Sequence, residues 1–280
     1  MADETLDVMS WLLKFFLARS RGVTVTIDTP ESLLWMRRFH PTPADSMRLI
    51  CFPFAGGSAS YFRPLSELLA PNLDVVGIQY PGRQDRHRED VIDDIPSLVA
   101  QIADVVADSL DRPFAFFGHS MGSLVAFEAV RHLTVQGGPL PQALFVSGRR
   151  APSVQRLEAV HQLNDADLMA EMRSLGGTDS ALLNDQEIVR MILPAIRGDY
   201  RAVETYQYSP GSSVLDVPII AMIGDQDPRV TITEARTWEH HTSRDFDLHV
   251  FPGGHFYLNH FTADVAKEIN MALNHTSEDR

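Results

Sequence analysis

The stretch FAFFGHSMGSLVAFEAVRHL at residues 114–133 carries the most informative pattern in the chain. Its first four residues are apolar and predict a short buried strand, and residues 123–133 predict a helix. Between them, GHSMG at residues 118–122 matches G-x-S-x-G, a sharp strand-to-helix turn that raises a serine hydroxyl above the edge of a sheet. We therefore expect Ser120 to be a nucleophile. The alternative is an ordinary glycine-bounded helix start in which Ser120 is only the cap.

Strand and helix patterns alternate on both sides of this turn. Apolar runs predict strands over residues 47–54, 73–80, 143–147, 217–223 and 246–251. Helical spacing of apolar residues predicts helices over residues 61–70, 94–110, 231–239 and 262–273. Near-continuous apolar strands that alternate with helices are typical of a parallel sheet covered on both faces. Together with the serine turn, the pattern predicts an α/β-hydrolase fold with a mostly parallel central sheet.

The alternation is interrupted over residues 149–211. This part has no strong strand pattern, but helices are predicted around residues 164–174, 185–197 and 198–206. We expect a helical lid, inserted between two strands of the sheet. Residues 1–30 are predicted to be an N-terminal extension of unknown role, and residues 31–280 to be one catalytic domain that includes the lid.

A base and an acid are needed to activate the serine, because its hydroxyl is a weak nucleophile at neutral pH. His255 follows the last predicted strand, at the sheet edge where ligands bind in open α/β sheets. In this fold the acid stands between serine and histidine in the chain. Asp225 and Asp227 are both candidates, and we favour Asp227 as the residue that orients His255. Asp225 could instead hold its loop by side-chain hydrogen bonds.

The other histidines near these motifs are expected to play no part in catalysis. We expect the His119 side chain to point away from the nucleophile that it precedes. The remaining ones fall on or near predicted helices and are assigned to the surface: His240, His241, His260 and His275.

An oxyanion hole should complete the site. In G-x-S-x-G hydrolases one donor is the backbone N–H of the residue after the nucleophile, which here is Met121. The second donor comes from the loop after the first strand, which reads FPFAGGS at residues 52–58. Its glycines permit close approach of the backbone, and we expect Ala55 to supply the second N–H.

Composition excludes several other classes of protein. The chain has 37 acidic and 24 basic residues, a net charge of −13, and no basic tract, so nucleic acid is not an expected partner. The single cysteine, Cys51, lies in an apolar run and is expected to be a buried structural residue. No apolar run reaches the ~18 residues that span a bilayer, and acidic residues come first at the N-terminus, unlike a signal peptide. We expect a cytoplasmic protein.

Several further motifs give the chain a specific resemblance. From near Trp35 onward it resembles the type II thioesterases that accompany modular polyketide synthases and nonribosomal peptide synthetases. The tetrapeptide YPGR at residues 80–83 is the most specific match, since esterases in general need not have it. Residues 172–178 and 193–200 resemble the helical lid of that family. The other matching motifs are RLICFPFAGGS (48–58), FGHSMG (117–122), GDQDP (224–228) and GGHF (253–256).

The resemblance implies a function. Such enzymes hydrolyse aberrant or stalled acyl groups from the phosphopantetheine arm of acyl or peptidyl carrier proteins. They need no metal and no organic cofactor of their own, and we expect a monomer whose partners are carrier proteins. Arg149 and Arg150 are candidate carrier contacts, and solvated surface arginines are the alternative.

Two other classes of function remain open from the sequence. A carboxylesterase or lipase acting on small esters would use the same three residues. A non-catalytic α/β-hydrolase that binds a ligand or a partner would normally lack one of them.

Overall fold

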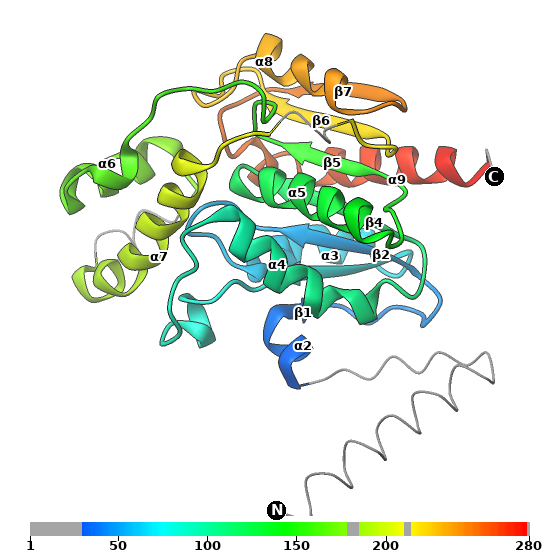
Figure 1. Cartoon of the computed structure of the whole chain (residues 1–280), viewed down its shortest axis with the longest axis horizontal. Helices are drawn as coiled ribbons and strands as arrows, with labels where there is room; N and C mark the ends of the chain where they lie inside the picture. Colours follow the sequence, from blue (N-terminus) through cyan, green and yellow to red (C-terminus); the bar gives the residue numbers. More distant parts are fainter. Residues whose placement is uncertain (1–29, 178–184, 210–213, 279–280) are drawn as a thin grey trace, which may run out of the picture.

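The computed structural model describes residues 30–177, 185–209 and 214–278, and the predicted N-terminal extension lies outside them except for its last residue. At its centre is a seven-stranded sheet with the strand order β1-β3-β2-β4-β5-β6-β7 (Figure 1). Strands β2 to β7 pair in parallel, whereas β1 pairs with β3 in antiparallel fashion. The predicted fold class is confirmed. The strands are β1 (Met36–Arg38), β2 (Met47–Phe52), β3 (Leu73–Ile78), β4 (Phe114–His119), β5 (Leu144–Ser147), β6 (Ile219–Gly224) and β7 (Phe246–Phe251).

Helices cover both faces of the sheet, as the near-continuous apolar strands require. In Figure 1, α4 and α5 lie in front of the sheet, and α3 and α9 lie behind it. Alternate residues of β2 face the helices on opposite sides of the sheet. Ile50 and Phe52 pack with α4 and α5, whereas Leu49 and Cys51 pack with α3 and α9. The helices of the described chain are α2 (Pro30–Trp35), α3 (Arg63–Leu69), α4 (Ile95–Val106), α5 (Met121–Gln136), α6 (Asp165–Leu175), α7 (Gln186–Thr205), α8 (Ile232–Arg236) and α9 (Thr262–Glu278).

The predicted helical insertion between β5 and β6 contains α6 and α7, which lie together beyond one end of the sheet (Figure 1). They share a small apolar core of their own, formed by Leu168, Met169, Met172, Leu193 and Ile196. The prediction of two helices over residues 185–197 and 198–206 was wrong, because α7 runs unbroken through this region.

Two residues that favour a break are accommodated within α7. Pro194 lies inside the helix and removes one backbone hydrogen bond, and the buried residues around it keep this part packed. Gly198 allows the helix to approach Val91, since a Cβ at this glycine would lie 2.6 Å from a Val91 methyl carbon. Tertiary packing therefore overrides the local preference for a helix end.

The structure also contains two elements that the sequence did not predict. Helix α2 and strand β1 precede β2, and β1 forms the outer edge of the sheet beside β3. Strand β1 has three residues, which is too short to show the alternation of apolar and polar residues by which a strand is predicted. The predicted strands at 47–54 and 73–80 each end two residues earlier than expected, and the remaining residues belong to loops at the carboxyl edge of the sheet.

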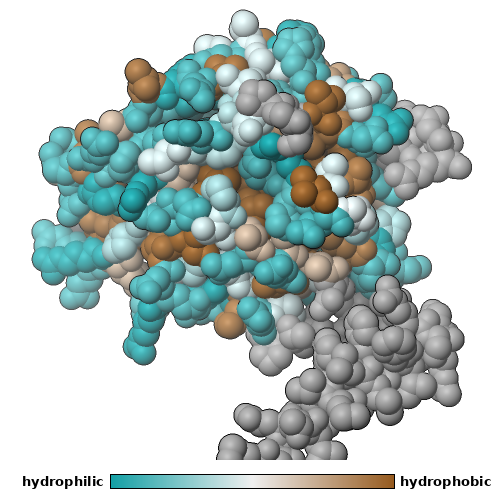
Figure 2. Space-filling view, in the orientation of Figure 1, coloured by the Kyte–Doolittle hydropathy of each residue, from teal (hydrophilic) through white to brown (hydrophobic). Residues whose placement is uncertain are grey.

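The surface is mainly polar. Hydrophilic residues cover most of the face in Figure 2, with apolar residues in patches between them. Among the described residues, no helix has the length and apolar character needed to cross a membrane.

Candidate active site

Ser120 occupies a strained turn between β4 and α5. Its backbone has φ 55° and ψ −116°, a conformation rarely adopted by a residue with a side chain. The flanking glycines make the turn possible. A Cβ at Gly118 would lie 2.2 Å from the Gly122 carbonyl oxygen, and a Cβ at Gly122 would lie 1.9 Å from the Phe52 carbonyl oxygen. The Ser120 N–H donates to the Ser147 carbonyl oxygen at 2.7 Å, which ties the turn to β5.

The structure brings Ser120, His255 and Asp227 into one hydrogen-bonded chain. The Ser120 hydroxyl donates to His255 Nε2 at 2.9 Å, and His255 Nδ1–H donates to the two Asp227 carboxylate oxygens at 2.9 and 3.0 Å. His255 is 3% exposed and Asp227 is 8% exposed. Because the carboxylate can only accept, it favours the tautomer in which Nε2 is free to take the serine proton.

Asp225, two residues before Asp227, makes a different contact. It accepts the Gly253 N–H at 2.8 Å and thereby ties the loop after β6 to the loop that carries His255. The two loops also touch through Gly224, where a Cβ would lie 2.3 Å from the carbonyl oxygens of Gly253 and Gly254. Of the two predicted candidates, Asp227 therefore faces the imidazole, and Asp225 holds the loop.

The predicted oxyanion donors lie at the same place. Ala55 and Met121 line one cavity of about 30 Å³ together with Ser120 and His255. Met121 is the first residue of α5, so its N–H has no acceptor within the helix. The cavity has room for about one water molecule next to the serine hydroxyl.

This geometry can perform acyl transfer through a covalent serine intermediate. It contains a hydroxyl beside a base and a carboxylate that orients the base, next to the two residues predicted as oxyanion donors. The model of the thioesterase domain family matches residues 47–273. The chain belongs to the thioesterase family.

Similar proteins support the same assignment for this thioesterase. It is 45% identical over 244 residues to the thioesterase PikA5 of Streptomyces venezuelae, covering 87% of this chain and 86% of the relative. A probable cadicidin biosynthesis thioesterase of Streptomyces griseus is 46% identical over 255 residues, covering 91% of this chain and 70% of the relative. The solved type II thioesterase BorB from the borrelidin biosynthetic cluster superposes with a TM-score of 0.80 at 47% identity, covering 86% of this chain and 98% of BorB. The predicted resemblance to type II thioesterases is confirmed, and the chain is a thioester hydrolase.

Charged side chains line part of the cavity in this thioesterase, among them Arg150, Glu158 and Arg229. Arg150 donates to Glu158 at 2.6 Å, and Arg229 lies between Glu158, at 3.2 Å, and Glu171. Burial acts to raise the pKa of Glu158, but the hydrogen bond from Arg150 and the nearby guanidinium groups outweigh it and lower that pKa. Burial also lowers the pKa of Arg149 to about 10.

The prediction for Arg150 as a surface group needs correction. The side chain is 5% exposed and takes part in this ion-pair network, so it is not a freely solvated surface group. The sequence around Arg149 and Arg150 does not indicate that Glu158 will pair with Arg150.

Two further histidines are buried in the thioesterase, and for one of them, His241, the sequence had predicted a place on the surface. His119 is fully buried, hydrogen-bonds through Nδ1 to Ser147 Oγ at 2.9 Å, and lies with its ring centroid 5.3 Å from that of His255. Burial lowers the pKa of His119 well below its ordinary value, and nearby His255 adds to this effect. His241 was assigned to the surface, but it is 2% exposed and hydrogen-bonds to Ser153 Oγ at 2.8 Å.

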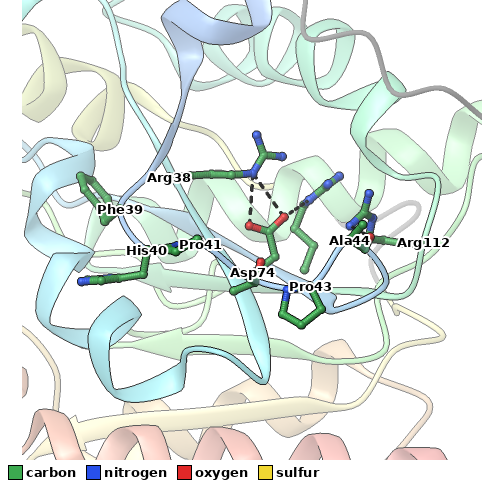
Figure 3. Close-up of a pocket in the computed structure, with 10 residues that line it drawn as sticks. Arg38, Phe39, His40, Pro41, Pro43, Ala44, Asp74 and Arg112 are labelled. Atoms are coloured by element: carbon green, nitrogen blue, oxygen red, sulfur yellow. Dashed lines mark hydrogen bonds and ion pairs between the residues drawn. The ribbon is translucent and has the colours of Figure 1, made fainter.

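A separate hollow of about 410 Å³ lies at the opposite ends of the strands, beside the start of β2 and β3. Figure 3 shows Arg38 directed at Asp74, and its Nε donates to the two carboxylate oxygens at 3.1 and 3.3 Å. Arg48 donates to the same carboxylate at 3.0 Å, and Arg112 pairs with Asp111 at 3.3 Å. These arginines are engaged by carboxylates and hold the amino ends of the strands together.

Within the described part of the chain, no group of three or more His, Cys, Asp or Glu residues has the arrangement of a metal site.

Proposed function

We propose that this thioesterase hydrolyses aberrant or stalled acyl groups from the phosphopantetheine arm of acyl or peptidyl carrier proteins. The hydrogen-bonded chain from Ser120 through His255 to Asp227, beside the backbone of Ala55 and Met121, is the observation that carries this proposal. The pathway class is supported by relatives such as BorB, from the borrelidin cluster, and YbtT, described as a type II thioesterase from a yersiniabactin NRPS/PKS pathway.

The first half of the reaction transfers the acyl group to the enzyme. Ser120 Oγ attacks the thioester carbonyl carbon while His255 Nε2 takes the hydroxyl proton. Asp227 stabilises the imidazolium that forms, and the N–H groups of Ala55 and Met121 donate to the oxyanion. The carbon–sulfur bond then breaks, and the pantetheine sulfur leaves as a thiol with the proton from His255.

The second half releases the acyl group as a carboxylic acid. Water attacks the acyl–serine ester while His255 takes one of its protons, and the same backbone groups hold the second oxyanion. The ester bond breaks, Ser120 Oγ regains a proton from His255, and the enzyme returns to its starting state. This cycle uses side chains, backbone donors and water, and we propose no cofactor for it.

We further propose that residues 149–211 act as a lid that shapes access to Ser120. The small cavity at Ser120 shares five lining residues with a neighbouring hollow of about 440 Å³, namely Arg149, Arg150, Glu158, Val203 and Glu204. A pantetheine arm must reach the serine from solvent, and this hollow adjoins the cavity and is lined mainly by residues of the insertion. Movement of the insertion would widen the 30 Å³ cavity enough to admit an acyl group.

The proposal is tested by comparing one acyl group on two leaving groups. The kcat/KM value for the acyl group on carrier-bound phosphopantetheine should exceed that for the same acyl group as a small oxygen ester by at least about 100-fold. Equal or higher values for the oxygen ester would favour a carboxylesterase. Labelling by a serine-reactive fluorophosphonate, with Ser120→Ala as the control, separates both enzymes from a non-catalytic binding protein.

A further inference from the structure

Asp199 connects the inserted helix α7 to the loop that carries Ala55. Its side chain is 1% exposed, and its two carboxylate oxygens have different partners. Oδ2 accepts the backbone N–H of Gly56 at 2.7 Å, and Oδ1 accepts Nη2–H of Arg83 at 2.7 Å. The carboxylate therefore bridges three segments that are far apart in the chain.

Arg83 depends on Asp199 for its charge compensation. It is 6% exposed, and within the described residues its Nε and Nη1 atoms have no hydrogen-bond partner. Its guanidinium carbon lies 5.1 Å from the centre of the Tyr80 ring, and the Tyr80 hydroxyl donates to the Pro53 carbonyl oxygen at 3.4 Å. The YPGR motif thus contacts the same loop from its other side.

The loop that carries Ala55, held by Asp199 and by Tyr80, has little freedom to adopt another position. Gly56 has φ +77°, and a Cβ there would lie 2.7 Å from a side-chain carbon of Ile196, also on α7. Further along, the Ala59 N–H donates to Gln79 Oε1 at 3.0 Å. Because Gly56 follows Ala55 directly, the carboxylate that holds the Gly56 N–H also limits rotation of the neighbouring peptide group.

We propose that Asp199 is a positioning residue that aims the Ala55 N–H at the oxyanion. It does so by holding the Gly56 amide, while Arg83 keeps the carboxylate ionised and correctly turned. The inference rests on the proposed function, since it assumes that Ala55 is an oxyanion donor. It adds a role for the YPGR motif and for α7, neither of which touches the reacting atoms through these contacts.

The position of Asp199 also places acyl recognition and transition-state stabilisation on one helix. Tyr200, Val203 and Glu204 of α7 line the cavity at Ser120, and Asp199 precedes the first of them. Residues that contact an acyl group and the residue that holds the oxyanion loop are therefore neighbours on α7.

The first test is the Asp199→Asn variant. An amide has one oxygen, but both Gly56 and Arg83 donate, so one donor must face the NH₂ group. We expect kcat on an acyl carrier to fall by about 10- to 100-fold, because a misdirected oxyanion donor weakens only the transition state. KM should stay within about twofold of wild type, and the inhibition constant of an alkyl boronic acid, which forms a tetrahedral adduct, should rise with the same factor as kcat falls.

Asp93→Asn is the matched control. Asp93 accepts from Arg201 of α7 at 2.6 Å in an exposed ion pair, so this change removes another link to the same helix without touching the oxyanion loop. We expect kcat within about twofold of wild type.

A second variant covers the case in which an uncompensated Arg83 prevents folding. The double variant Arg83→Met with Asp199→Leu removes both charges, and apolar replacement of a buried ion pair is often tolerated. It should unfold at a higher temperature than Asp199→Leu alone, yet keep the lowered kcat. A folded double variant or Asp199→Asn variant with kcat within twofold of wild type would overturn the inference.

Ser120→Ala separates the two proposals. Hydrolysis by Ser120→Ala would contradict the proposed function. An inactive Ser120→Ala together with a fully active Asp199→Asn would contradict only the positioning role of Asp199.

Discussion

Replacing Asp227 with asparagine should remove most of the activity while leaving the fold intact. One Asp227 oxygen accepts both the Arg229 N–H, at 2.8 Å, and the imidazole Nδ1–H, at 3.0 Å, and the other accepts from Nδ1 at 2.9 Å. In the variant, the amide oxygen satisfies Arg229 and the NH₂ group faces Nδ1. The imidazole then carries its proton on Nε2 and cannot accept from Ser120.

A wrong tautomer in a serine hydrolase costs about 10⁴ in kcat, which corresponds to about 5 kcal/mol of barrier. The assay is release of thiol from an acyl thioester, followed with a thiol-reactive dye, together with thermal unfolding of each variant. Asp225→Asn is the comparison, since its amide oxygen can still accept the Gly253 N–H, and it should cost about tenfold or less. A loss below tenfold in Asp227→Asn, or a larger loss in Asp225→Asn, would refute this assignment of the acid.

Three further predictions concern the backbone, the cysteine and the buried carboxylate. Gly122→Ala places a Cβ 1.9 Å from the Phe52 carbonyl oxygen, so it should destabilise the protein by about 3 kcal/mol or more; an unchanged midpoint of thermal unfolding would contradict this. Burial raises the pKa of the Cys51 thiol, so a maleimide at pH 8 should label this residue only after denaturation, and rapid labelling of the native protein would show that β2 is accessible. Burial raises the pKa of Asp199 from 3.8 to about 6 despite Arg83 and the Gly56 N–H. The folded protein therefore binds the extra proton, so the stability that this carboxyl contributes is complete below about pH 4 and is lost as the pH rises to about 6. The free energy of unfolding of wild type, measured relative to Asp199→Asn by urea titration, should fall over that interval, and a rise would reverse the assigned direction.

The candidate active site could be located from the sequence because each residue belongs to a local pattern at the end of a strand. Ser120, Asp227 and His255 follow three different predicted strands, and parallel strands bring their carboxyl ends to one edge. The order serine, acid, histidine along the chain then indicates which residue is the nucleophile, which is the acid and which is the base. Only the choice between Asp225 and Asp227 needed coordinates, since both follow the same strand and their hydrogen bonds depend on the loop conformation.

The contacts of the inserted helix could not be predicted in this way. Asp199 and Gly56 are 143 positions apart, and an aspartate within an amphipathic helix has no local feature that distinguishes a buried ion pair from a surface charge. The continuity of α7 through Pro194 was also missed, because it depends on packing that the local sequence does not contain. His241 was misplaced for the same reason.

The central claim is that Ser120 cleaves the thioester of an acyl group on a carrier protein. Its most direct test is mass spectrometry of an acyl-loaded carrier after mixing with wild type and, separately, with Ser120→Ala. The account predicts that wild type alone removes the acyl mass and leaves the phosphopantetheine arm with an intact thiol. Loss of the acyl mass with Ser120→Ala, or retention of it with a wild-type enzyme that cleaves simple esters, would contradict the account.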